Sequence, residues 1–119
     1  MVVQLPPMKV AQGEPWGYDF TVEGQDWTGY TGTATFKRSV KAVTGSNWWS
    51  DEKVEPIVTV DVVSDSAGLI QIALAPAQTA LFPALDRQGY FRQAMCQVTM
   101  TDGTDVQAFQ SRVMVAASV

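Results

Sequence analysis

The chain has 119 residues, of which 46% are hydrophobic and 17% charged, and its formal net charge is −4 with a pI of about 4.5. This balance predicts one folded domain and disfavours nucleic acid as a partner, because neutralising phosphates requires clustered Lys and Arg. No apolar run is long enough for a membrane helix or a signal peptide, so we expect no membrane contact.

The first 15 residues are predicted to form an N-terminal arm and edge strand, ahead of a single β-sandwich domain over residues 16–119. Pro6 and Pro7 exclude a central strand, because proline cannot donate to a strand ladder. Two interpretations of this segment remain open. It either reaches a neighbouring molecule or frays from the domain.

Strand signals then follow at short intervals. Residues 16–22 alternate, with Trp16, Tyr18 and Phe20 on one face. Further β-prone runs cover residues 32–40, 54–63 and 69–75. Pro76 suits the first position of a short helical turn, which Pro83 ends.

The C-terminal third, Gly89–Val115, is predicted to be a long hairpin with its tight turn at Asp102-Gly103. Its second strand alternates, with Phe109 and Val113 on the inner face. Its first strand has apolar residues on both faces, since Phe91 and Met95 oppose Val98 and Met100; we therefore expect something to cover the outer face. The pattern as a whole predicts an all-β fold: an immunoglobulin-like antiparallel β-sandwich of about seven strands with one short helical turn.

Loop tryptophans stand out in this small domain. Trp48 and Trp49 are adjacent in a long connection over residues 41–53, and Trp27 lies in the loop over residues 23–31. Adjacent side chains in an extended chain face opposite ways, so both Trp48 and Trp49 cannot easily enter one core. Trp48 and Trp49 either pack within their loop or anchor a protein interface, and all three tryptophans are candidates for an interface or for stacking against sugars.

No catalytic constellation is present in the sequence. The absence of His removes the Ser-His-Asp and Cys-His arrangements and the commonest zinc sites. Cys96 is alone and is predicted to be a buried hydrophobe. Asp51, Glu52 and Glu55 are interpreted as solvated charges rather than a glycosidase pair. We therefore expect no enzymatic activity, no cofactor and no metal.

Three stretches carry a resemblance to a known family: Asp26–Lys37 (DWTGYTGTATFK), Gly68–Phe82 (GLIQIALAPAQTALF) and Gly89–Val115. They are similar to turn and packing signatures of the N-terminal immunoglobulin-like domain of siphophage upper baseplate proteins and related tail-associated proteins. The resemblance implies a non-enzymatic structural protein of a tailed-phage virion, in the tail tip, baseplate or fibre-attachment region. It implies other virion proteins and copies of the chain as partners, with synthesis in the bacterial cytoplasm and a final location in the virion.

The alternative from a different class is a carbohydrate-binding β-sandwich that uses loop tryptophans on a host-surface glycan. The candidate interface residues are Trp48, Trp49, Trp27, Phe91, Met95, Pro6 and Pro7, and the carbohydrate alternative would use Trp27, Trp48 or Trp49 as stacking platforms.

Overall fold

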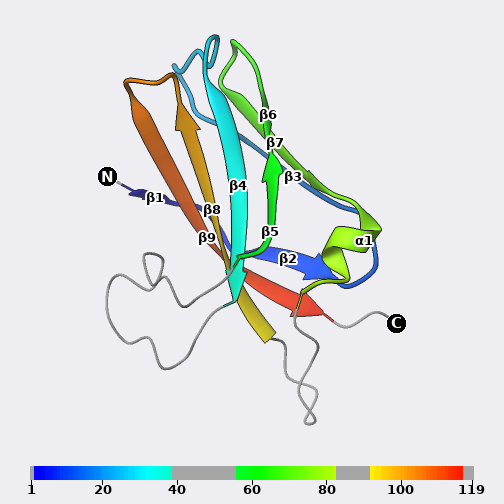
Figure 1. Cartoon of the computed structure of the whole chain (residues 1–119). Helices are drawn as coiled ribbons and strands as arrows, with labels where there is room; N and C mark the ends of the chain where they lie inside the picture. The colour runs from blue at the N-terminus through cyan, green and yellow to red at the C-terminus, as the bar shows by residue number, and fades with distance from the viewer. Residues whose placement is uncertain (1, 39–55, 83–91, 117–119) are drawn as a thin grey trace.

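The computed structural model describes residues 2–38, 56–82 and 92–116, which form two packed β-sheets and one short helix (Figure 1). The elements in chain order are β1 (Val2–Gln4), β2 (Met8–Ala11), β3 (Trp16–Thr21), β4 (Thr31–Arg38), β5 (Pro56–Asp61), β6 (Val63–Ser64), β7 (Leu69–Leu74), α1 (Pro76–Thr79), β8 (Arg92–Thr101) and β9 (Val106–Ala116).

The larger sheet has the strand order β1-β9-β8-β4-β5, and β2 also pairs with β9. Its centre is the predicted C-terminal hairpin, in which β8 and β9 pair antiparallel from Arg92–Val115 to Thr101–Val106. The β4 strand continues the sheet antiparallel to β8, and β5 pairs antiparallel with β4 at one edge. The N-terminal strands at the other edge run parallel to β9, a departure from the fully antiparallel sandwich that the sequence predicted.

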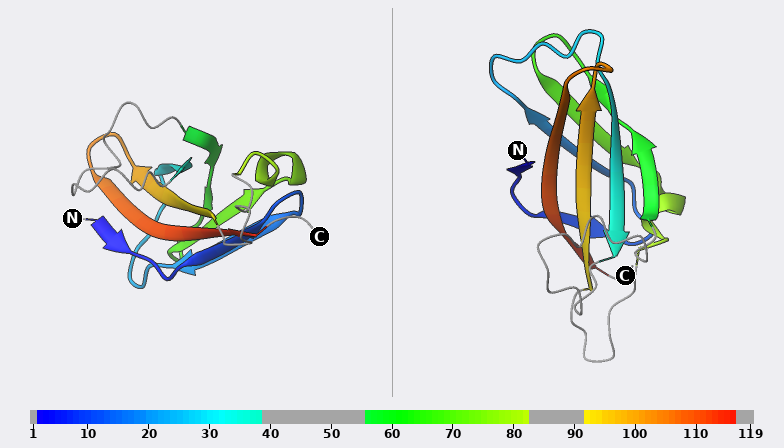
Figure 2. Two further views of the ribbon diagram at one scale, coloured as in Figure 1. Left: turned by 90° about the horizontal axis from the view of Figure 1, so that it is seen from below. Right: turned by 60° about the vertical axis from the view of Figure 1, so that its left-hand side comes forward.

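The smaller sheet has the order β3-β7-β6 and covers the inner face of the larger one (Figure 2). A three-strand layer facing a layer ordered β9-β8-β4-β5, with the chain crossing between layers, is the arrangement of an immunoglobulin-like sandwich. The predicted fold class is confirmed. The strands are more numerous than the expected seven, because the N-terminal edge is split in two and a two-residue β6 follows β5.

Alternation places the core where the sequence predicted it. The inner face of β9 carries Phe109, Ser111, Val113 and Val115, all buried, while Arg112 between them is exposed. Phe36, Ile72, Val98 and Val113 are buried as expected, whereas Phe20 is only partly buried because β3 is an edge strand. The core residues contributed by the central strands include Ala34, Phe36, Ile70, Cys96, Val98 and Met100.

One of two local predictions needs correction. The helix begins at Pro76 as expected, and the Ala75 N–H donates to the Gln78 Oε1 at 2.8 Å. The β8–β9 turn is not a two-residue turn. Thr101 pairs with Val106, so four residues, 102–105, make the connection, with Gly103 at a φ of 98°.

Candidate interaction surface

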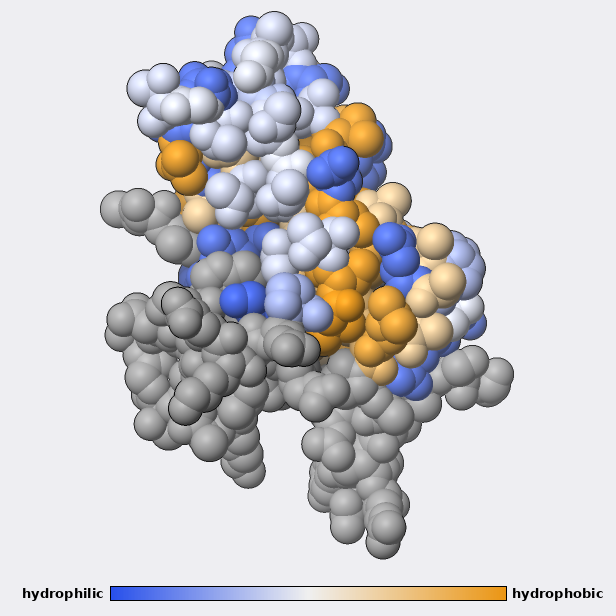
Figure 3. All heavy atoms as spheres, viewed as in Figure 1, coloured by the Kyte–Doolittle hydropathy of each residue, from blue (hydrophilic) through white to orange (hydrophobic). Residues whose placement is uncertain are grey.

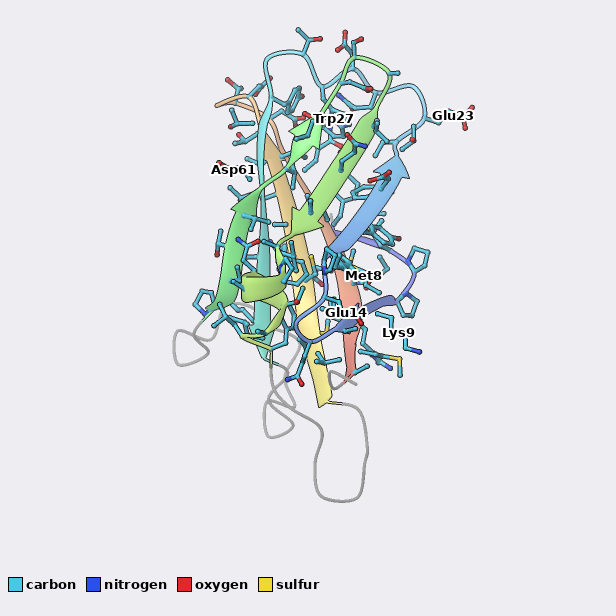
Figure 4. The ribbon with its side chains drawn as sticks, turned by 90° about the vertical axis from the view of Figure 1, so that its right-hand side faces the viewer. Met8, Lys9, Glu14, Glu23, Trp27 and Asp61 are labelled. Atoms are coloured by element: carbon cyan, nitrogen blue, oxygen red, sulfur yellow. The ribbon has the colours of Figure 1, made fainter. Side chains whose placement is uncertain are left out.

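The N-terminal segment is an integral part of the sandwich and not an exposed arm. Met8 and Val10 are 2% and 0% exposed and join the core, as Figure 4 shows for Met8, with Lys9 outside it. Pro6 and Pro7 are exposed, and they lie between β1 and β2, where the pairing of the N-terminal segment with β9 is interrupted. The Ser111 hydroxyl donates to the Pro6 carbonyl oxygen at 2.7 Å, so the kink keeps a hydrogen bond to β9. Burial of Met8 makes this segment a structural edge, whose removal would open the core.

Trp27 is a core residue, which corrects its prediction as an interface or sugar-stacking residue. Its side chain is 2% exposed, and its Nε1–H donates to the Gly68 carbonyl oxygen at 3.0 Å. Tyr30 packs edge-on against the indole with ring centroids 5.1 Å apart. The signal that sequence reasoning missed is the pairing of Trp27 with Gly68, which no local pattern shows.

The remaining candidates divide between the outer sheet face and parts of the chain outside the described residues. Met95 lies on the outer face of β8, half-buried, between Lys37 of β4 and Arg112 of β9. Trp48, Trp49 and Phe91 fall outside the described residues. Of the predicted contact residues that the structure describes, Trp27 lies in the core, Pro6 and Pro7 lie at the N-terminal edge, and Met95 lies on the outer sheet face.

The outer face of the larger sheet carries a row of uncharged polar side chains that the sequence analysis did not find. The Gln4 Nε2 donates to the Gln110 Oε1 at 3.4 Å, and the Gln110 Nε2 donates to the Gln97 Oε1 at 3.0 Å. The same register continues to Thr35 and Thr59 on β4 and β5. Such cross-strand pairs stabilise a sheet surface. The row depends on the register of five strands, and only its Gln97–Gln110 step could have been inferred from the hairpin.

Aspartates gather at the end of the sandwich formed by the β3–β4, β6–β7 and β8–β9 connections, at the top of Figure 1. Asp26 accepts the Thr28 N–H at 2.8 Å, and Asp65 accepts the N–H groups of Ala67 and Leu69 at 2.9 and 3.0 Å. These bonds are the local side-chain-to-backbone contacts that favour Asp in turns. The carboxylates therefore fix loop conformation.

Asp105 also stabilises the loops at this end of the sandwich, but through side-chain partners. It accepts the Tyr30 hydroxyl at 2.8 Å and the Gln107 Nε2 at 3.1 Å. The hydrogen bond to Asp105 raises the pKa of Tyr30, because it stabilises the protonated phenol. Together with the Trp27–Tyr30 contact, this ties the β3–β4 loop to the β8–β9 turn.

Asp102 is expected to make the stability of the hairpin depend on pH. Its Oδ1 accepts the N–H groups of Asp105 at 2.7 Å and Thr104 at 2.9 Å, and these bonds lower the pKa of its carboxyl below 3.8. A lowered folded-state pKa contributes stability above the unfolded-state pKa, which is lost as pH falls through the folded value. We expect Asp102→Asn to reduce the urea midpoint at pH 6, and the gap from wild type to close towards pH 2. A gap that is independent of pH would contradict this role; Asp19→Asn, on the exposed face of β3, serves as the control.

Among the described residues there is no candidate cluster for a metal ion. They contain no group of three or more His, Cys, Asp or Glu side chains placed to hold a metal ion. Within these same ranges, no helix is long and apolar enough to cross a membrane. The described surface carries hydrogen-bonding strand edges, the polar row and exposed apolar side chains.

Cys96 lies in the core, and burial raises the pKa of its thiol to about 12. Because the thiolate is the reactive form, we expect the native protein at pH 8 to react with a thiol reagent more than about 100-fold more slowly than the urea-unfolded chain. Ellman's reagent measures both rates. Comparable rates in the two states would place Cys96 at the surface instead.

Comparison with known proteins adds little to this geometry. No protein-family model and no curated protein matches the sequence. Among solved structures, the chain is similar to the M1 domain from titin, at 12% identity and a TM-score of 0.44, over 95% of this chain and 90% of that one. The class of protein is therefore defined by its own topology: an immunoglobulin-like β-sandwich.

Proposed function

We propose that this chain is a non-enzymatic structural and assembly protein of a tailed-phage particle, in the tail tip, baseplate or fibre-attachment region. The observation that supports the non-enzymatic part is the use of four carboxylates in the turns. Asp26, Asp65 and Asp102 accept backbone N–H groups within their own turns, and Asp105 holds Tyr30. Side chains so engaged stabilise a scaffold, which then acts through its surface and strand edges.

The assignment to a phage particle is supported by the resemblance of three stretches to siphophage tail-associated domains. In this chain, Asp26–Lys37 covers a loop and most of β4, and Gly68–Phe82 covers β7 and α1. Gly89–Val115 contains β8 and most of β9. These stretches hold the centres of both sheets, and Gly68 accepts the indole N–H of Trp27. The resemblance therefore involves residues on which the packing depends.

The carbohydrate-binding alternative retains fewer candidates than the sequence suggested. Its platforms were Trp27, Trp48 and Trp49, and a side chain that is 2% exposed, as Trp27 is, cannot stack against a sugar. The alternative then depends on Trp48 and Trp49 alone. Partners under the leading proposal are other virion proteins and copies of this chain, with neither nucleic acid nor a membrane.

Quantitative mass spectrometry of purified particles tests the proposal. We expect the chain at a fixed copy number per particle, retained through density-gradient purification and high salt. Its absence from intact particles would overturn the proposal. Binding of the purified chain to a glycan array, lost in Trp48→Ala or Trp49→Ala, would instead establish the carbohydrate module.

A double variant tests the loop contact within the same particles. We expect Trp48→Ser with Trp49→Ser to keep the fold, measured by circular dichroism, and to reduce incorporation. Val106→Ser, which changes an apolar side chain that is 63% exposed at the start of β9, is the matched control. Equal incorporation of both variants and wild type would exclude Trp48 and Trp49 as the contact.

A further inference from the structure

The described strand edges of the two sheets differ in how well they are protected against pairing with another chain. The β1–β2 edge is broken at Pro6-Pro7, and β6 has only two residues. The β3 edge carries the exposed Asp19 at mid-strand. Proline, charge and short length are the devices that keep strand edges from associating. The β5 edge has none of them between Pro56 and Asp61, where its sequence is Ile-Val-Thr-Val.

The backbone of β5 presents its outward hydrogen-bonding groups at defined residues. Within the described part of the chain, β5 pairs with β4 alone. The Val62 N–H donates to the Gly32 carbonyl oxygen at 3.0 Å, and the register places Val60 opposite Ala34 and Val58 opposite Phe36. Because hydrogen-bonding direction alternates along an antiparallel strand, the even-numbered residues point their amide groups at β4. Thr59 and Asp61 consequently point theirs outward.

The side chains beside this edge are apolar and incompletely covered. Val58, Val60 and Val62 pack against the core but are only partly buried. Figure 3 shows the resulting apolar band along β5, beside paler polar atoms over β4. Further burial of this band is favourable, at about 25 cal/mol per Å² of apolar surface removed from water.

We propose that β5 pairs antiparallel with β5 of a second copy of this chain, about a two-fold axis through Thr59, to form one continuous sheet. This register satisfies the outward groups of both copies, since Thr59 lies opposite Thr59 as a doubly hydrogen-bonded pair. It sets Val58 of each copy opposite Val60 of the other on the inner face. A two-fold contact closes on itself and leaves this edge unavailable for further growth.

The Thr59-centred register also keeps the Asp61 carboxylates of the two copies apart. The chain is acidic, so close approach of two copies requires that their carboxylates stay apart. In the Thr59-centred register Asp61 lies opposite Ile57, and the two Asp61 residues fall at opposite ends of the contact. Figure 4 shows Asp61 directed away from the sandwich. The inference goes beyond the proposed function and does not depend on it.

Sedimentation velocity of the purified full chain tests the edge, with two variants at Thr59. At about 100 µM, a dimer with a Kd near 10 µM is largely assembled, so we expect wild type to sediment as a dimer and to dissociate on dilution. Thr59→Pro removes an outward N–H and leaves the bonds to β4, so we expect a folded monomer. Thr59→Val keeps that N–H and should remain a dimer. A wild-type monomer, or a dimeric Thr59→Pro variant, would overturn the inference.

Disulfide trapping provides a second test that does not depend on the proline variant folding. Opposed residues of a hydrogen-bonded pair have Cα atoms about 5.5 Å apart, within the range that a disulfide spans. We expect Thr59→Cys to form a covalent dimer on mild oxidation, and Thr33→Cys, exposed on the neighbouring strand β4, to form none. Trapping at Thr33 but not at Thr59 would overturn the edge contact and point to the outer face. Because these experiments use the purified chain, absence from phage particles would leave their outcome unaffected.

Discussion

Replacing Phe36 by alanine should lower the free energy of unfolding by about 3–5 kcal/mol, the range for truncating a buried aromatic residue. Phe36 is 0% exposed in the second half of β4, between Val58 of β5 and Cys96 of β8. Its ring meets those of Trp16 and Phe82 edge-on, with centroids 5.8 and 5.4 Å apart. The side chain thus joins β3, β4 and the residues after α1.

The cost depends on how little the surroundings can collapse into the space. Trp16 is the first residue of β3, and its backbone is held by pairing with β7. Phe82 follows α1, and its N–H donates to the Thr79 carbonyl oxygen at 3.2 Å. A cavity that neighbours cannot fill adds to the lost transfer free energy. Urea unfolding followed by circular dichroism measures the change.

A control on the same strand separates core loss from strand loss. Thr33 is exposed on the outer face of β4, and Thr33→Ala should change stability by no more than about 0.5 kcal/mol. An unchanged urea midpoint for Phe36→Ala would remove Phe36 from the core and contradict the register of β4 against β5 and β8.

The elements predicted correctly are those whose signal is local. Alternation in the segments that form Trp16–Thr21 and Val106–Ala116 predicted the strands and their inner faces, because side chains of a strand alternate whatever it pairs with. The β-prone run over residues 69–75 likewise predicted the strand Leu69–Leu74. Pro76 gave the start of α1 for an equally local reason. The fold class followed from the spacing of such segments.

The errors concern contacts between residues far apart in the chain. The sequence around Pro6-Pro7 is compatible with an arm, and only the pairing of β2 with β9 shows that Met8 and Val10 complete the core. The hairpin turn was predicted too short because Asp102 bonds across it to Asp105 and Thr104, which extends the loop. The polar row through Gln97 and Gln110 needed the sheet register, which periodicity does not supply.

Trp27 is the clearest example of a long-range contact that the sequence did not predict. Its substitution is expected to have the second large effect on the free energy of unfolding. A tryptophan between Asp26 and Thr28-Gly29 has a loop sequence on both sides, which is also typical of an exposed contact residue. In the structure its backbone N–H donates to the Asp65 carbonyl oxygen at 3.2 Å, while its indole donates to Gly68. The loop is therefore anchored on the β6–β7 turn, and the indole fills that end of the core beside Phe109.

Trp27→Ala should accordingly destabilise the fold by about 3–5 kcal/mol, whereas Trp27→Phe should cost about 1–3 kcal/mol, since it retains most of the buried area. The carbonyl oxygen of Gly68 also accepts the Val22 N–H at 2.9 Å, so loss of the indole bond leaves it with one partner and limits the penalty for phenylalanine. Urea unfolding of both variants gives the two values. If Trp27→Ala unfolds at the wild-type urea midpoint, the side chain is not in the core, and Trp27 would again be a candidate for an exposed contact residue.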